Sequence, residues 1–123
     1  MNRAKLALRS AIALAALGAA PCAFAHAFLD HADPRVGSTV DHAPGQVTLW
    51  FTEELEPAFS KLRVLDANGH EVDAKDGAVD AKDRAVMRAT VRGLPPGKYR
   101  VEWRALSADT HVTSGHFTFE VRR

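Results

Sequence analysis

The chain has 123 residues, of which 25% are charged and 46% are hydrophobic, and it contains a single cysteine, Cys22. This composition is typical of one small globular domain without a disulfide framework. Three of the 16 basic residues and none of the 15 acidic residues fall within residues 1–25, which leaves residues 26–123 with a net charge of −2 when the histidines are neutral. Because nucleic-acid-binding domains normally carry a basic excess or stripe, this balance argues against a nucleic-acid partner.

The first 25 residues have the pattern of a cleavable signal peptide. Positive Arg3, Lys5 and Arg9 precede an apolar run over residues 11–20, and Ala23-Phe24-Ala25 provides the small residues that a signal peptidase recognises. The apolar run is shorter than the roughly 20 residues that a membrane-spanning helix needs. We therefore predict cleavage after Ala25, export to the periplasm without membrane insertion, and a mature domain of residues 26–123.

Three segments of the predicted mature domain alternate apolar and polar residues with a period of two. They cover residues 47–51, 99–105 and 117–121, and this period is typical of a strand that is buried on one face. No segment shows a convincing helical period over more than a turn or two. The class predicted from these segments is all-β.

Turn residues separate these segments from further short strands expected at residues 62–65 and 86–91. Asn68-Gly69 predicts a tight hairpin, since both residues tolerate positive φ, and Pro95-Pro96-Gly97 predicts a strand end. About seven short strands in roughly a hundred residues indicate a single immunoglobulin-like domain, a two-sheet Greek-key β-sandwich.

One internal repeat interrupts the strand pattern. Residues 72–76 and 79–83 both have the sequence Val-Asp-Ala-Lys-Asp. The spacing of the aspartates does not match a calcium-binding loop, and no bidentate glutamate follows at the required offset. We interpret the repeat as a solvated loop.

His26 becomes the first residue of the chain if the signal peptide is removed after Ala25. An N-terminal histidine offers its free α-amine and an imidazole nitrogen to the same metal ion, and these two donors suit Cu(II). Asp109-Thr110-His111 follows the predicted strand at residues 99–105. In an extended segment, residues two apart point to the same side, so the carboxylate and the imidazole are expected side by side. Together with the donors of His26 they would form a three-nitrogen, one-oxygen set that favours Cu(II) over tetrahedral zinc.

Several motifs resemble the CopC family of periplasmic copper-binding proteins. They are His26-Ala27-Phe28-Leu29, Pro34-x-x-Gly37, Leu49-x-Phe51-Thr52-Glu53, Tyr99-x-Val101-x-Trp103-Arg104-x-x-Ser107-x-Asp109-x-His111, and Ser114-Gly115-His116-Phe117-Thr118-Phe119. The resemblance covers nearly the whole predicted mature chain. It implies an immunoglobulin-like sandwich that binds one Cu(II) through His26, Asp109 and His111, with Glu53 as an outer-shell acidic group or a weaker ligand.

The same resemblance implies a non-enzymatic, monomeric carrier that exchanges copper with a CopD-type membrane protein. Some family members also have a methionine-rich segment that serves as a Cu(I) site. This chain has only Met1, inside the predicted signal peptide, and Met87. Because Cu(I) prefers soft sulfur ligands, we predict a protein that binds Cu(II) only.

Two other functions remain open from the sequence. Copper held by an N-terminal histidine also resembles the site of lytic polysaccharide monooxygenases, although a ligating Asp109 would occupy the position that oxygen needs. A metal-free immunoglobulin-like adhesion or chaperone module is the second alternative.

The remaining histidines are expected at the surface, with His116 on the polar side of the last strand and His31, His42 and His70 among turns or early strands. We expect Met87 in the core and both tryptophans in the core or on a sheet face.

Overall fold

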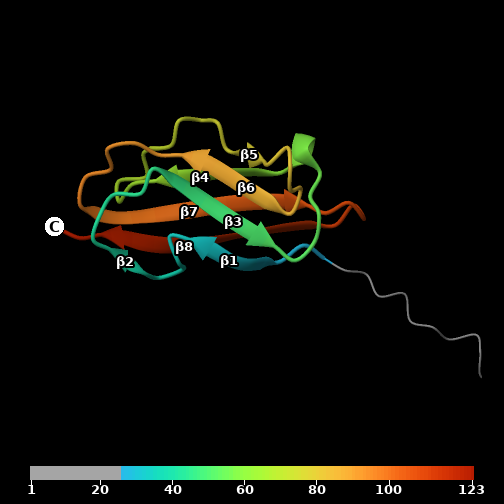
Figure 1. Ribbon diagram of the computed structural model, residues 1–123, viewed down its shortest axis with the longest axis horizontal. Helices are drawn as coiled ribbons and strands as arrows, with labels where there is room; N and C mark the ends of the chain where they lie inside the picture. Colours follow the sequence, from blue (N-terminus) through green and yellow to red (C-terminus); the bar gives the residue numbers. More distant parts are fainter. Residues whose placement is uncertain (1–25) are drawn as a thin grey trace, which may run out of the picture.

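The computed structural model describes residues 26–123, so the predicted signal peptide, including Cys22, lies outside the described residues. The described part of the chain forms two four-stranded sheets packed face to face (Figure 1), which confirms the predicted all-β sandwich. Within residues 26–123 no helix is long and apolar enough to cross a membrane. The first sheet has the order β1 (Leu29–Asp33), β3 (Gln46–Phe51), β6 (Val86–Thr90), β5 (Ala78–Val79); the second has the order β2 (Thr39–Val40), β8 (Val112–Val121), β7 (Gly97–Leu106), β4 (Lys61–Leu65).

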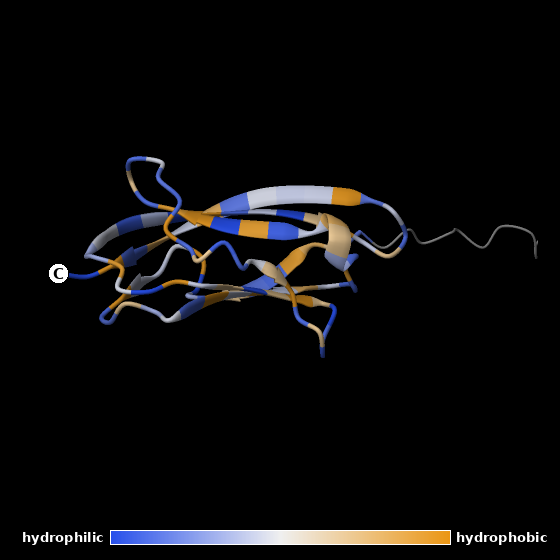
Figure 2. Ribbon diagram, turned by 90° about the horizontal axis from the view of Figure 1, so that it is seen from above, coloured by the Kyte–Doolittle hydropathy of each residue, from blue (hydrophilic) through white to orange (hydrophobic). Residues whose placement is uncertain are grey.

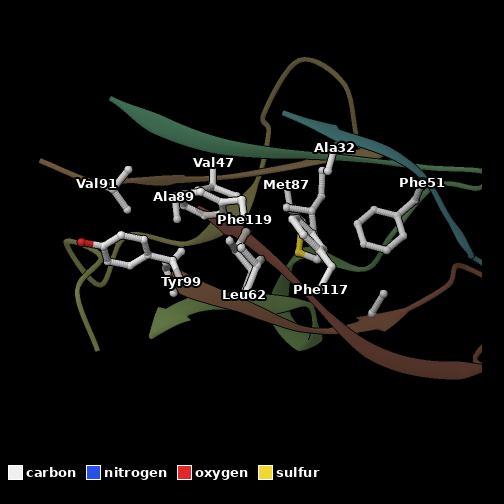
Figure 3. Close-up of a cluster of buried hydrophobic side chains, with 14 of the residues drawn as sticks. Ala32, Val47, Phe51, Leu62, Met87, Ala89, Val91, Tyr99, Phe117 and Phe119 are labelled. Atoms are coloured by element: carbon white, nitrogen blue, oxygen red, sulfur yellow. The ribbon is translucent and has the colours of Figure 1, made fainter. Parts of the chain in front are cut away.

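The core lies between the two sheets, which Figure 2 shows as two layers. The predicted alternation is confirmed on all three strands that carry it, because the apolar residues of β3, β7 and β8 point inward, with Val47 and Val101 fully buried. Met87 fills the space between the layers, as expected, and contributes no exposed surface. Figure 3 shows this packing, in which Phe117 and Phe119 from the second sheet face Ala32, Val47 and Met87 from the first.

The longest strands of the described domain are β7 and β8, which form a hairpin and pair over ten residues each. Trp103 on β7 lies opposite Gly115 on β8. A Cβ atom at position 115 would lie 2.6 Å from Trp103 Cζ2, closer than packed atoms approach, so this glycine makes room for the indole ring. The indole in turn packs edge-on against Phe51 of the other sheet, with ring centroids 5.2 Å apart.

The turn after β4 differs from the tight hairpin predicted from Asn68-Gly69. Gly69 has φ of +84°, but Asn68 is not among the described residues with positive φ. Asp66 reaches across a longer turn instead, because its Oδ1 accepts the backbone N–H groups of both Asn68 and His70. The Asp66 side chain thus stabilises a longer turn, in place of a two-residue turn that would need positive φ at both residues.

The segment of residues 66–85, which we call the aspartate segment, contains the repeat. Asp73 and Asp80 occupy equivalent positions in the two copies, and each accepts the backbone N–H of the lysine two residues later, at 2.8 and 3.0 Å. Asp76 accepts the backbone N–H and the hydroxyl of Thr90. These carboxylates close turns and attach the segment to β6, which supports a structural role over a calcium site. The segment is only partly a loop, because it includes β5 and therefore Val79 of the second repeat copy.

The end of the sandwich on the right in Figure 1 brings together three segments that are far apart in the sequence. They are the beginning of the described chain, the 3-10 helix η2 (Pro57–Phe59) with the loop before it, and the connection between β7 and β8. The C-terminus lies at the opposite end. The arrangement places His26 near the β7–β8 connection.

Candidate metal centre

The connection between β7 and β8, residues 107–111, is a turn that reverses the chain. The backbone N–H of Thr110 donates to the carbonyl of Ser107 at 2.9 Å, and the N–H of Ser107 donates to the carbonyl of His111 at 3.0 Å. Thr110 has φ of +72°, in the left-handed region that tight reversals require. The prediction that Asp109 and His111 lie on an extended segment is therefore wrong. The two side chains do come together, but a turn brings them there.

Ser107 organises this turn from a buried position, with only 1% of its surface exposed. Its hydroxyl donates to Asp109 Oδ1 and accepts the backbone N–H of His111 at 3.3 Å. The Ser107 hydrogen bond, followed by the hydrogen bond and charge of His111, holds the pKa of the Asp109 carboxyl below its ordinary value, although partial desolvation acts in the opposite direction. Asp109 is therefore an anion at neutral pH.

The three predicted ligands form a chain of direct neighbours. Asp109 Oδ1 lies 3.3 Å from His111 Nδ1. The imidazole rings of His111 and His26 meet edge to face, with centroids 4.3 Å apart and an interplanar angle of 87°. Residues separated by more than 80 positions in the sequence thus meet at one point of the surface, with His26 and His111 half-buried.

The segment of residues 26–28, which we call the N-terminal strap, lies between the two sheets at this end. The Thr52 hydroxyl, at the end of β3, donates to the His26 carbonyl at 3.3 Å and accepts the Phe28 N–H at 3.0 Å. The Thr113 hydroxyl, on β8, donates to the Ala27 carbonyl at 2.6 Å. Ala27 itself is fully buried in the core. These contacts determine where the His26 side chain emerges.

Glu53 lies in the loop between β3 and η2, which packs against the 107–111 turn. The backbone N–H of Ala108 donates to the Glu54 carbonyl at 3.2 Å, and the N–H of Glu56 donates to the Leu106 carbonyl at 2.8 Å. The Glu53 side chain is exposed. Glu53 adjoins the turn through its loop, while the Asp109–His111 ion pair and the His26–His111 ring contact lie within the cluster.

No group of three or more His, Cys, Asp or Glu side chains in the described part of the chain is arranged to hold a metal ion by itself. The arrangement nevertheless has the chemistry of a copper site: two imidazoles in contact and an ionised carboxylate beside one of them. A fourth donor, the α-amine of His26, exists only when the chain begins at this residue. Since it is a backbone group, a site that includes it needs fewer side chains.

The other histidines lie away from this cluster. His116 is exposed on the outer face of β8, opposite Glu102, and lines a surface hollow of about 770 Å³ that includes none of the predicted ligands. His31 is exposed as expected, but it has partners: its ring stacks on Trp50 with centroids 4.4 Å apart, and Nδ1 lies 2.6 Å from Asp30. His70 lies 3.6 Å from Asp66, and His42 is exposed.

Comparison with known proteins identifies the family. The model of the CopC domain matches residues 29–122. The chain belongs to the CopC family. It is 35% identical over 113 residues to copper resistance protein C of Escherichia coli, covering 86% of this chain and 89% of that protein. The crystal structure of PcoC, described as a methionine-rich copper resistance protein from Escherichia coli, superimposes with a TM-score of 0.69 and 38% identity, covering 80% of this chain and all of that one.

A third relative shows the domain in a larger setting. The chain is 34% identical over 99 residues to the copper transport protein CutJ of Bacillus subtilis, and the match covers 80% of this chain but only 18% of CutJ. The chain therefore corresponds to a small part of that longer protein.

The sequence did not assign a role to Ser107, Thr52 or Thr113. Ser107 and Thr52 lie within motifs shared with CopC, but a small hydroxyl residue in such a motif has no chemistry that identifies its partner. Only the fold shows that Ser107 bonds Asp109 and that Thr52 and Thr113 hold the N-terminal strap.

Proposed function

We propose that this CopC protein is a periplasmic, non-enzymatic Cu(II) carrier that binds one copper ion per mature chain through the amine and imidazole of His26, the carboxylate of Asp109 and the imidazole of His111. The contact between the rings of His26 and His111, 4.3 Å apart, is the observation that carries the proposal. It brings the predicted first residue of the mature chain next to the Asp109–His111 pair. The copper resistance proteins to which the chain is similar support copper as the metal.

The donor set favours Cu(II) on chemical grounds. Three nitrogens and one oxygen suit the tetragonal geometry of Cu(II), whereas structural zinc prefers a tetrahedral arrangement. The Asp109 carboxyl has a pKa below its ordinary acidic value and is ionised near neutral pH, as an ordinary aspartate also is, so copper does not have to displace a proton from it there. Glu53, in the adjoining loop, is proposed as an outer-shell acidic group that helps to orient the amine.

The methionines support a preference for Cu(II) over Cu(I). Met87 is fully buried in the core, so its sulfur is not presented to a metal at the surface. PcoC is described as methionine-rich, whereas this chain has no methionine other than Met1 and Met87. Titration of the mature protein with Cu(I) in competition with a Cu(I) chelator is expected to show weak binding, and tight Cu(I) binding would contradict the Cu(II)-only assignment.

The position of the cluster suits a carrier that exchanges its metal with a partner. The ligands lie on a turn and at the chain terminus, at the end of a rigid sandwich, where a second set of ligands can approach. We propose a CopD-type membrane protein as that partner. The match to a small part of the copper transport protein CutJ supports a role for this domain beside a larger transport protein.

The decisive experiment compares two mature proteins that differ at one position. One begins at His26 and the other carries a single glycine before it, which converts the α-amine to an amide. Both are titrated with Cu(II) at pH 7 against a competing chelator, and their electron paramagnetic resonance spectra are recorded. We expect weaker binding and a changed nitrogen coordination in the extended protein. Equal affinities and identical spectra would show that the amine is not a ligand.

A further inference from the structure

The N-terminal strap leaves the sheet before it reaches the metal cluster. Strand β1 begins at Leu29, so residues 26–28 lie beyond its regular ladder with β3. Terminal residues outside a ladder normally fray. In this chain, however, Ala27 is fully buried and packs in the core between two residues that are at least partly exposed.

Two threonine hydroxyls replace the missing ladder, and they come from different sheets. Thr52, at the end of β3, uses its hydroxyl on both peptide groups that flank Ala27, and its own backbone N–H donates to the Phe28 carbonyl at 2.9 Å. Thr113 binds the Ala27 carbonyl at 2.6 Å from the second sheet. Each of the three consecutive carbonyls of the strap thus accepts a hydrogen bond.

Thr113 also connects the strap to the other half of the site. It lies two residues after His111, at the start of β8. The strand that directly follows His111 therefore also holds the backbone next to His26, so one short connection links the positions of the two imidazoles. The ring contact at 4.3 Å is the geometric result.

We infer that Thr52 and Thr113 are positioning residues for the copper site, which hold the N-terminal strap so that the amine and imidazole of His26 are presented beside His111 before the metal arrives. This inference rests on the proposed role of His26 as a ligand. A terminal residue that is already ordered loses less freedom when it chelates copper. Ordering the backbone of one residue corresponds to about a tenfold change in an equilibrium constant, so each threonine is expected to contribute up to about that factor to Cu(II) affinity.

The test uses Thr52→Val and Thr113→Val, which remove the hydroxyl and retain the branched shape, in a protein that begins at His26. Thr118→Val is the matched control, because Thr118 is exposed on the same strand as Thr113 and its side chain makes no hydrogen bond within residues 26–123. Thr113→Ser, which retains the hydroxyl, should restore affinity. We expect about a tenfold loss of Cu(II) affinity for each valine variant of the strap and no change for Thr118→Val.

A second readout requires no copper. In the metal-free protein the Phe28 amide donates to Thr52 Oγ1, so Thr52→Val should accelerate hydrogen exchange at this amide while exchange in β7 and β8 stays unchanged. Unchanged exchange at Phe28 would contradict the assignment of Thr52. Because Thr52 is exposed, its substitution is compatible with folding and carries the test even if Thr113→Val destabilises the domain.

The two proposals can be separated by repeating the valine substitutions in a glycine-extended His26→Ala protein, which lacks both the α-amine and the imidazole of His26. If the threonines act through His26, they have no effect on the residual copper affinity in this background. An equal loss in both backgrounds would show a general structural role and overturn the inference. If the glycine-extended His26→Ala protein binds copper as tightly as the mature protein, the proposed function itself fails.

Discussion

The 107–111 turn and the aspartate segment both place carboxylates on reversals of the chain, but they use them differently. In the aspartate segment, Asp66, Asp73 and Asp76 each accept backbone N–H groups. In the turn, the partners that lower the pKa of Asp109 most are two side chains, the hydroxyl of Ser107 and the imidazole of His111. Asp66 also lies 3.6 Å from an imidazole, that of His70, whereas the imidazole beside Asp109 is itself in contact with a second one, that of His26.

This difference is consistent with a structural role for the acidic, repeated segment and with the proposed copper-binding role of the single Asp-x-His. The aspartate segment has more carboxylates, and the imidazole that pairs with one of them is that of His70. The turn has one carboxylate, and the fold brings to it two imidazoles from distant parts of the sequence. The number of potential ligands is therefore less informative than the partners that the fold gives to each of them.

The largest expected effect comes from His111→Ala, which removes a proposed ligand from the turn. Partners that only orient a ligand are worth about 10- to 100-fold in metal affinity, so loss of a ligand nitrogen is expected to cost at least about 100-fold. Isothermal titration with Cu(II) in a competing buffer measures this change. His116→Ala is the control, since His116 lies on the outer face of β8. Comparable affinity of the two variants would remove His111 from the site.

The corresponding change in the aspartate segment is Asp73→Ala. It deprives the backbone N–H groups of Val64 and Lys75 of their acceptor, both at 2.8 Å, and Val64 is fully buried. Unfolding in urea should show a loss of about 1–3 kcal/mol, the cost of leaving a buried donor unpaired. Copper affinity should stay unchanged below the unfolding transition. If the Asp73→Ala protein is as stable as the parent but binds copper with altered affinity, the aspartate segment contributes to copper binding and the two regions do not differ in role.

Much of the fold follows from the sequence because the period-two pattern directly reflects which face of a strand is buried. The segments at residues 47–51, 99–105 and 117–121 coincide with β3, β7 and β8, although β8 begins at Val112. The strands that the pattern did not reveal, β1, β2 and β5, are short or irregular. The register of β1 shifts between Leu29 and His31, which interrupts the alternation, and two residues of β2 or β5 are too few to show a period.

Sequence reasoning anticipated that the candidate ligands lie close together, but not how the fold holds them. Sequence reasoning selected His26, Asp109 and His111, which the structure brings together. It selected Glu53 as well, whose exposed side chain lies in the adjoining loop. It did not identify Ser107, Thr52 or Thr113 as supports, because a hydrogen bond between Thr113 and Ala27 joins residues 86 positions apart. Such pairings depend on how the sheets meet, which no local pattern encodes.

Glu53→Gln should reduce Cu(II) affinity less than His111→Ala does. An outer-shell carboxylate that orients an amine acts only through another group, so Cu(II) affinity is expected to fall by about tenfold or less. Glu54→Gln, with an exposed side chain in the same loop, is the matched control and should behave as the unmodified protein. Competition titrations at pH 7 compare the three proteins. If both glutamine variants lose affinity equally, the effect is that of net charge and not of position 53.

The smallest expected effect separates the two regions by pH. Copper binding should weaken as the medium is acidified, because protons compete with the metal for the amine and imidazole nitrogens. The Asp76 carboxyl titrates lower, because the hydroxyl and then the backbone N–H of Thr90 hold its pKa below the ordinary value. A carboxyl with a depressed pKa stabilises the fold above its ordinary pKa of about 3.9, and this contribution disappears as the pH falls through the folded value.

Thr90→Val removes the hydroxyl that donates to Asp76 at 2.6 Å but leaves the backbone bond at 2.8 Å. The pKa of Asp76 should then move back toward its ordinary value, so the variant is slightly less stable than the parent at pH 7, and the part of the difference that depends on ionised Asp76 vanishes below the folded pKa. Urea unfolding of both proteins at pH 7, 5 and 3, repeated in an Asp76→Asn background where the titration is absent, isolates this contribution.

Because Asp76 is far from the turn in the fold, copper affinity at pH 7 should be the same for Thr90→Val and the parent. A stability difference that stays constant from pH 7 to pH 3 would show that Thr90 acts by packing alone, and a change in copper affinity would show that the two groups of carboxylates are coupled.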